Sequence, residues 1–114
     1  MSSNGFVELN DAATLEEFLK RSVETPVVLF KHSNTCGISA RAHHEMARVK
    51  EPVGIITVQR ARALSTEIER RFNLPHETPQ VLVIRQNQVV WHASHGHVRA
   101  QEVESAVAEN SQQG

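Results

Sequence analysis

Apolar residues along this chain follow two spacings, one typical of buried β-strands and one typical of amphipathic α-helices. Short runs rich in β-branched residues predict strands, while apolar residues three or four positions apart predict helices. The strands are expected at residues 6–9, 27–31, 53–58, 80–84 and 89–91. The helices are expected at residues 11–21, 37–50 and 61–71 and around Val103, Ala106 and Val107. Strands that alternate with helices imply a parallel sheet with right-handed crossovers, to which the last two strands add an antiparallel edge.

Turn and capping residues set several boundaries between these elements. Pro52 is expected to end the second helix, because proline disrupts a helix interior. Asp11 or Thr14 can cap the first helix, with Glu17 three residues after Thr14 in capping-box spacing. Residues 86–88 supply a turn between the last two strands, which are therefore expected to pair as a hairpin.

The composition is that of an ordinary globular domain, with 39% apolar and 22% charged residues. Its 114 residues are expected to form one domain over 1–114, with a frayed polar tail at 109–114. A formal net charge of −1 gives no basic field, so neither nucleic acid nor an anionic membrane is an expected partner. No apolar stretch approaches a membrane span, and the N-terminal residues do not have the pattern of a secretory signal.

The only cysteine, Cys36, lies between the predicted second strand and the predicted second helix. The free N–H groups and the positive end of the helix dipole favour a thiolate there, and the thiolate is the nucleophilic form. A lone cysteine can instead be a small buried apolar residue, but the polar neighbours Ser33, Asn34 and Thr35 disfavour deep burial. One cysteine excludes an intramolecular disulfide, which fits the reducing cytoplasm, the compartment that we expect.

Polar residues close to Cys36 are candidates for supporting roles. Thr35 precedes the cysteine, and Lys31 and His32 end the preceding strand, where a cation would lower the thiol pKa further. Successive strand residues point to opposite faces of a sheet, so at most one of these two can face the thiol. Ser39 follows the cysteine by three residues, and its hydroxyl can either approach the sulfur or bond the local backbone.

Histidine is frequent, with seven residues in the chain, but its spacing does not predict a metal site. His92, His95 and His97 are unlike a helical i, i+4 pair, and no nearby carboxylate or cysteine completes a ligand set. His43 and His44 are adjacent on the second helix and are expected to form a solvated face. We therefore expect no bound metal and no tightly bound cofactor.

The order of the elements, with a cysteine at the start of the second helix, resembles the thioredoxin fold. The resemblance implies an α/β fold with a central mixed sheet flanked by helices. Proteins of this fold carry a cis-proline just before the fourth central strand, facing the active cysteine. Thr78–Pro79, directly before residues 80–84, matches that place. The resemblance therefore implies a cis Thr78–Pro79 bond, although most X-Pro bonds are trans.

Within this fold, the sequence is similar to the monothiol bacilliredoxins, redox proteins of the bacillithiol system. The shared features are Leu-Phe-Lys-His-Ser at 29–33, Thr35-Cys36-x-Ile38-Ser39, Thr78-Pro79-Gln80, and Trp-His-Ala-Ser-His at 91–95. The resemblance covers residues 6–107 and implies that the protein removes bacillithiol from S-bacillithiolated proteins or exchanges thiols at a nearby step of the same pathway. It also favours a position for Ser39 near the sulfur.

The activity implied by this resemblance is that of a monothiol thiol–disulfide oxidoreductase. The Cys36 thiolate would attack the low-molecular-weight-thiol sulfur of a protein mixed disulfide, with the N–H groups of Gly37 and Ile38 stabilising charge on sulfur. Thr78–Pro79 would shape the groove that aligns the disulfide, and Ser94–His95 could bind the small thiol. The implied partners are S-thiolated proteins, bacillithiol or a similar thiol as co-substrate, and a second thiol or a reductase that frees the cysteine.

Gly37 departs from the bacilliredoxin pattern, which usually has proline after the active cysteine. Cys-Gly-Ile-Ser at 36–39 approaches the Cys-Gly-Phe-Ser signature of monothiol glutaredoxins, which bind an iron–sulfur cluster with glutathione, and Lys31 is similar to their conserved lysine. Their Gly-Gly-x-Asp segment is missing, and Ser94-His95-Gly96 stands near its place. An iron–sulfur cluster carrier is therefore the second hypothesis, and a non-catalytic binding module on a thioredoxin-like scaffold is the third.

Overall fold

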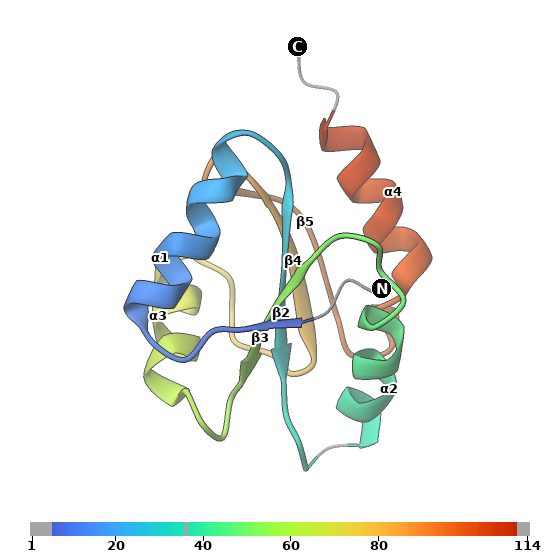
Figure 1. Ribbon diagram of the computed structural model, residues 1–114. Helices are drawn as coiled ribbons and strands as arrows, with labels where there is room; N and C mark the ends of the chain where they lie inside the picture. The colour runs from blue at the N-terminus through green and yellow to red at the C-terminus, as the bar shows by residue number, and fades with distance from the viewer. Residues whose placement is uncertain (1–5, 36, 112–114) are drawn as a thin grey trace.

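The computed structural model describes residues 6–35 and 37–111, and its elements follow the predicted order (Figure 1). The strands are β1 (Phe6–Glu8), β2 (Val27–His32), β3 (Val53–Thr57), β4 (Gln80–Arg85) and β5 (Gln88–Ser94). The helices are α1 (Ala12–Lys20), α2 (Gly37–Met46), α3 (Arg62–Phe72) and α4 (Ala100–Ser111). Two short 3₁₀ segments, η1 (Arg21–Val23) and η2 (His95–His97), follow α1 and β5.

The described strands form one mixed sheet in the order β1-β3-β2-β4-β5. Strands β1 and β2 both pair with β3 in parallel, whereas β4 pairs antiparallel with β2 and with β5. Figure 1 shows α1 and α3 on one side of the sheet and α2 and α4 on the other. The structure thus confirms the predicted central mixed sheet, its antiparallel edge and its covering helices.

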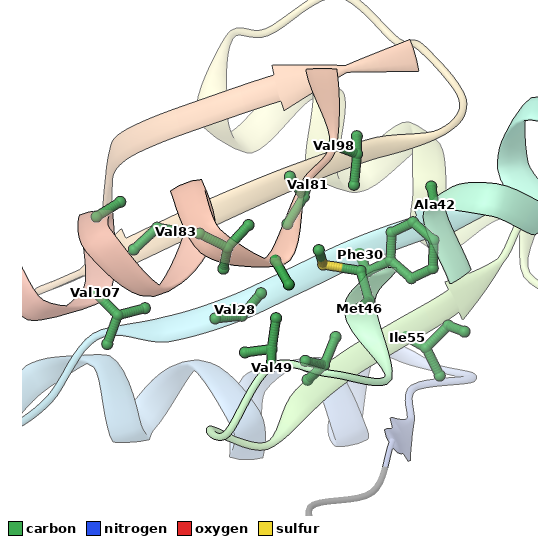
Figure 2. Close-up of a cluster of buried hydrophobic side chains, with 14 residues drawn as sticks. Val28, Phe30, Ala42, Met46, Val49, Ile55, Val81, Val83, Val98 and Val107 are labelled. Atoms are coloured by element: carbon green, nitrogen blue, oxygen red, sulfur yellow. The ribbon is translucent and has the colours of Figure 1, made fainter. Parts of the chain in front are cut away.

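The central strand β2 supplies side chains to both hydrophobic cores because its alternate residues point to opposite faces. Val28 and Phe30 lie in the core beneath α2 and α4, where Phe30 and Met46 are labelled in Figure 2. Leu29 lies in the other core, with residues of α1 and α3. The same alternation continues to the end of β2, so Lys31 is on the α1/α3 side and His32 is on the α2/α4 side.

Three predicted boundaries are wrong, each because tertiary contacts decide where an element ends. Helix α2 ends at Met46, not at residue 50, since beyond Ala47 its backbone bonds shorten to the i→i+3 type. Strand β5 continues to Ser94 because it pairs with β4 along its whole length. Helix α4 continues to Ser111, so residues 109–111 are helical and not a frayed tail; residues 112–114 lie outside the described part of the chain.

Local hydrogen bonds settle how α1 begins and how the last two strands turn. Asp11 caps α1: its Oδ1 accepts the Thr14 N–H at 2.9 Å, and Thr14 Oγ1 accepts the Asp11 N–H in return. The Thr14–Glu17 alternative is therefore wrong.

The β4–β5 turn uses Gln86 and Asn87, whose φ angles of 55° and 62° are those that a two-residue hairpin turn needs.

Candidate functional site

The candidate site lies where β2 ends at His32 and α2 begins at Gly37. Cys36, the predicted nucleophile, lies outside the described residues, but both of its flanks, residues 33–35 and Gly37 onward, are described. The first N–H groups of a helix have no partner within it, and with the helix dipole they favour a negative charge. Gly37 and Ile38 supply these groups, so the predicted role of this helix start stays consistent with the structure.

His32 and Lys31 are separated by the sheet. The His32 Nδ1 atom lies 2.9 Å from Ser39 Oγ in the first turn of α2. Lys31 lies on the other face, fully buried, and its Nζ has no hydrogen-bond partner among the described residues. Burial lowers the pKa of Lys31 from 10.5 to about 8, although Glu69 and Glu77 act in the opposite direction. Lys31 is therefore on the face opposite α2, and of the two only His32 contacts the start of that helix.

His32 belongs to a cluster of rings that also contains His43, Phe30 and Phe6. The His32 ring centroid is 4.9 Å from that of His43, and the His43 centroid is 4.6 Å from that of Phe6. Burial, and then the neighbouring His43, lower the pKa of His32 below 6.5, so its imidazole is largely neutral at neutral pH. His32 thus does not supply the cation considered from the sequence.

His43 corrects another expectation. It is half-buried and packs on Phe6 and Phe30, whereas its neighbour His44 is exposed. The prediction of a shared solvated face is therefore right for His44 only. The reason is the pairing of β1 with β3, which brings Phe6 over α2 from a distant part of the chain.

The Ser39 hydroxyl is buried and holds the chain that leads to the cysteine. Its oxygen accepts the Ser33 N–H at 2.9 Å, which leaves the hydroxyl hydrogen available for His32 Nδ1. Ser39 therefore joins the first turn of α2 to the end of β2. Whether it also approaches the sulfur depends on Cys36, which is outside the described residues, so that part stays a prediction.

Gln59, in the turn after β3, is a residue that the sequence interpretation missed. Its Nε2 donates to Ser33 Oγ at 2.8 Å and to Thr35 Oγ1 at 3.2 Å, and its Oε1 accepts the Asn34 N–H at 3.2 Å. Thr35, predicted as a supporting residue, thus contacts Gln59. No local motif marks a single glutamine in a turn, and its partners are about 25 residues away in the chain.

The Thr78–Pro79 bond is cis, as the resemblance predicted. Pro79 O accepts the His95 N–H at 2.9 Å, which joins this segment to the end of β5. His95 has a φ of 56°, a left-handed conformation that is uncommon for residues other than glycine, although histidine adopts it more often than most. Its Nε2 lies 3.0 Å from Glu77 Oε1. The structure therefore brings His95 to the proline segment, next to an acidic group.

A groove of about 490 Å³ lies beside this segment, along the outer strand β5 and η2. It is lined by Glu77, Trp91, His92, Ala93, Ser94, His95, His97 and Glu102. Both predicted thiol-binding residues, Ser94 and His95, are among these residues. Polar groups, among them two carboxylates and three imidazoles, lie there beside the apolar surface of Trp91 and Ala93, which suits a small ligand that has both polar and apolar parts.

Gly37 and Ile38, the first two residues of α2, are both exposed. A Cβ atom added at Gly37 would meet nothing within 4 Å, so packing does not require glycine there. Ile38 is 52% exposed, unusually open for a large apolar side chain. The surface next to Cys36 in the sequence is therefore open to a partner.

The described residues contain no group of three or more histidine, cysteine, aspartate or glutamate side chains that could hold a metal ion. Over the same residues, none of the helices has both the length and the apolar character needed to cross a membrane.

The chain is similar to a known protein family and to solved structures with a thioredoxin fold. Residues 7–103 match the model of the family described as monothiol bacilliredoxin BrxC. A solved structure described as a candidate oxidoreductase with a thioredoxin fold is 27% identical, with a TM-score of 0.82 and coverage of 89% of this chain and 92% of that one. A thioredoxin variant from Halobacterium salinarum NRC-1 is 12% identical, with a TM-score of 0.72 and coverage of 100% and 97%. Thioredoxin from Trypanosoma brucei brucei is 8% identical, with a TM-score of 0.74 and coverage of 96% and 94%.

Proposed function

This chain belongs to the monothiol bacilliredoxin family and has a thiol redox role, and from this premise we propose that it removes a low-molecular-weight thiol, bacillithiol or a close analogue, from protein mixed disulfides. The observation that carries the proposal is that the only cysteine directly precedes the first residue of α2. Its substrates would be S-thiolated proteins in the cytoplasm. No tightly bound cofactor takes part, because the small thiol itself is the co-substrate.

The reaction is an exchange of disulfide partners without net oxidation or reduction. The Cys36 thiolate attacks the sulfur of the small thiol, a new disulfide forms there, and the bond to the target protein breaks. The target leaves as a thiolate and takes a proton from solvent. A second small thiolate, or a reductase, then attacks the cap on Cys36 and restores the free thiolate. The second attack must come from another molecule, since the chain has no second cysteine.

The acidity of the thiol would come from the start of α2. His32 is largely neutral and bonded to Ser39, and Lys31 is buried on the opposite face of the sheet. The N–H groups of Gly37 and Ile38, together with the helix dipole, are the groups that we assign to stabilising negative charge on sulfur.

The small thiol would lie in the groove beside the proline segment. Thr78–Pro79 would align the disulfide, while Ser94 and His95 would contact the remainder of the molecule. The hydrogen bond from His95 N–H to Pro79 O supports this assignment because it links the proline segment to the groove. Ile38, being exposed, would contact the target protein.

The direct test is Cys36→Ser. Serine is favoured at helix N-termini, so the variant should fold, but its hydroxyl stays protonated and cannot form the mixed disulfide. Wild type and variant would be incubated with an S-bacillithiolated test protein, with the cap followed by mass spectrometry. We expect a cap on wild-type Cys36 and no transfer to the variant. Equal release by both proteins would contradict the proposal and favour a binding module on the same scaffold.

A second candidate, an iron–sulfur cluster carrier, rests on Gly37, because Cys-Gly-Ile-Ser at 36–39 is similar to the signature of cluster-binding monothiol glutaredoxins. Anaerobic reconstitution with iron, sulfide and glutathione, followed by visible absorption, tests it. We expect no stable cluster, and we expect Gly37→Pro to retain thiol exchange. A stable cluster that is lost in Gly37→Pro would make cluster transfer the better assignment.

A further inference from the structure

We propose that Gln59 is a positioning residue: it holds the segment Ser33–Thr35 and thereby sets the acidity and the exchange rate of Cys36. The effect on exchange rests on the proposed function, whereas the effect on thiol acidity does not. Gln59 comes from the turn between β3 and α3 and not from the segment that it holds.

Gln59 contacts every residue between β2 and Cys36. Its amide nitrogen donates to the hydroxyls of Ser33 and Thr35, and its amide oxygen accepts the Asn34 N–H. Ser33 Oγ in turn lies 3.3 Å from Thr35 Oγ1 and accepts the Thr35 N–H at 3.4 Å. One side chain therefore uses both ends of its amide to fix both hydroxyls and a backbone group of a short loop.

The turn that carries Gln59 is itself fixed against β2. The Val58 N–H donates to His32 O at 2.9 Å, which extends the β2–β3 pairing to the residue before Gln59. The N–H groups of Arg60 and Ala61 both donate to Thr57 O at 2.9 and 3.0 Å and close the turn. Gln59 is thus held at its backbone, and its side chain can restrain the segment opposite.

A second restraint acts on the same segment from the helix side. Ser39, in the first turn of α2, accepts the Ser33 N–H. The residues that lead into Cys36 are therefore held between the β3–α3 turn through Gln59 and the helix α2 through Ser39. Loss of the Gln59 contacts would release residues 33–35 from the β3–α3 turn, and would thereby loosen the segment that leads to the free N–H groups of α2.

The amide of Gln59 carries no charge, so it cannot change the thiol pKa by direct charge–charge interaction. Both ends of the amide are bonded to residues 33–35, so we assign its influence to the position of the loop. Gln59 thus has a positioning role and not an electrostatic one. We therefore expect the thiol pKa to rise when the amide is removed. The side chain is exposed, so its truncation should leave the overall fold intact.

The experiment measures alkylation of Cys36 by iodoacetamide against pH in wild type and Gln59→Ala. We expect a higher thiol pKa and a rate at neutral pH lower by roughly threefold to tenfold, since each unit of pKa increase lowers the fraction of the reactive thiolate by up to about tenfold. Urea unfolding, followed by fluorescence, should change little. A matched control, Gln101→Ala, truncates an exposed glutamine on α4 and should leave both measurements unchanged. An unchanged thiol pKa in Gln59→Ala would overturn the inference.

A double-mutant cycle tests whether Gln59 acts through the loop. If it does, Ser33→Ala and Gln59→Ala combined should slow alkylation by less than the product of the two single effects, because both remove the same contact. Independent effects that multiply would contradict the inference. The exchange assay on a capped protein is then run on the same variants. If the wild type transfers no cap, the proposed function is contradicted but the role of Gln59 is not, because the alkylation assay tests Gln59 without the exchange reaction.

Discussion

Lys31→Met should make the protein more stable. The lysine side chain is fully buried, and its Nζ has no hydrogen-bond partner among the described residues. An ammonium in this position loses its hydration, and Glu69 and Glu77 compensate only in part, because the net effect is a pKa lowered to about 8. Methionine has a similar length and no charge. Replacing a buried, poorly paired charge with an apolar side chain of matched volume commonly stabilises a protein.

The size of the effect follows from the pKa. The difference between 10.5 in the unfolded chain and about 8 in the folded protein, at about 1.36 kcal/mol for each unit, corresponds to about 3 kcal/mol of destabilisation. This cost is complete below pH 8, where both states are protonated. Between pH 8 and 10.5 the unfolded chain binds more protons, so the stability of the wild type rises with pH. Above pH 10.5 the lysine is neutral in both states, and this destabilisation is absent.

The assay is urea unfolding followed by the fluorescence of Trp91, the only tryptophan, at pH 7 and at pH 10.5. At pH 7 we expect the free energy of unfolding of Lys31→Met to exceed that of wild type by up to about 3 kcal/mol, and we expect this advantage to shrink at the higher pH. The chain has no tyrosine to titrate in this range. Lys20→Met, at an exposed position of α1, is the control and should show no such pH-dependent gain. A gain that is absent at pH 7, or equally large at both pH values, would refute the reasoning.

Three further substitutions test the packing, the helix cap and the ring cluster. Gly54→Ala would place a Cβ atom 2.7 Å from a ring carbon of Phe18, so we expect a loss of roughly 1–3 kcal/mol in urea unfolding, and an unchanged midpoint would contradict this. Asp11→Ala removes the acceptor of the Thr14 N–H and should lower the midpoint of urea unfolding, with Asp11→Asn retaining most of the stability, and an equal loss in both variants would contradict the capping role. His32→Phe should flatten the acid dependence of stability, since below pH 6.5 the unfolded wild type takes up a proton that folded His32 resists; an equally steep decline in the variant would exclude this cause.

The fold could be predicted because its signals are local. The run from Val27 to Phe30 is apolar and starts with two β-branched residues, as in a buried strand, and the structure places it at the centre of the sheet. Element ends were harder to predict. Val49 lies three residues after Met46, in the spacing of a helix, and it is buried, but it follows a turn that has already left the helix. Burial alone does not distinguish a helix from a turn that follows it.

The site could be predicted only where sequence neighbours decide it. The alternation of a strand was enough to separate Lys31 from His32, and the fold resemblance was enough to identify the cis bond at Pro79. The contacts of Gln59 and of His43 could not be predicted, because each joins elements that only the sheet order brings together. Neither residue stands in a pattern that marks its partner, so the side-chain pairs emerge only with the tertiary structure.

The residues on either side of Cys36 bear on how acidic its thiol is, and the proposed exchange reaction sets limits on that acidity. A monothiol protein must use one sulfur first as the attacking group and then as the leaving group. Lowering its pKa improves the second role but weakens the first, since nucleophilicity falls with basicity, and attack is fastest when the pKa lies near the ambient pH. A cation next to the sulfur would favour the leaving group. Here His32 is largely neutral and Lys31 faces the other side of the sheet. We therefore infer that the acidity of the thiol comes from the N–H groups at the start of α2, with Gln59 positioning the segment before it, and not from a neighbouring cation.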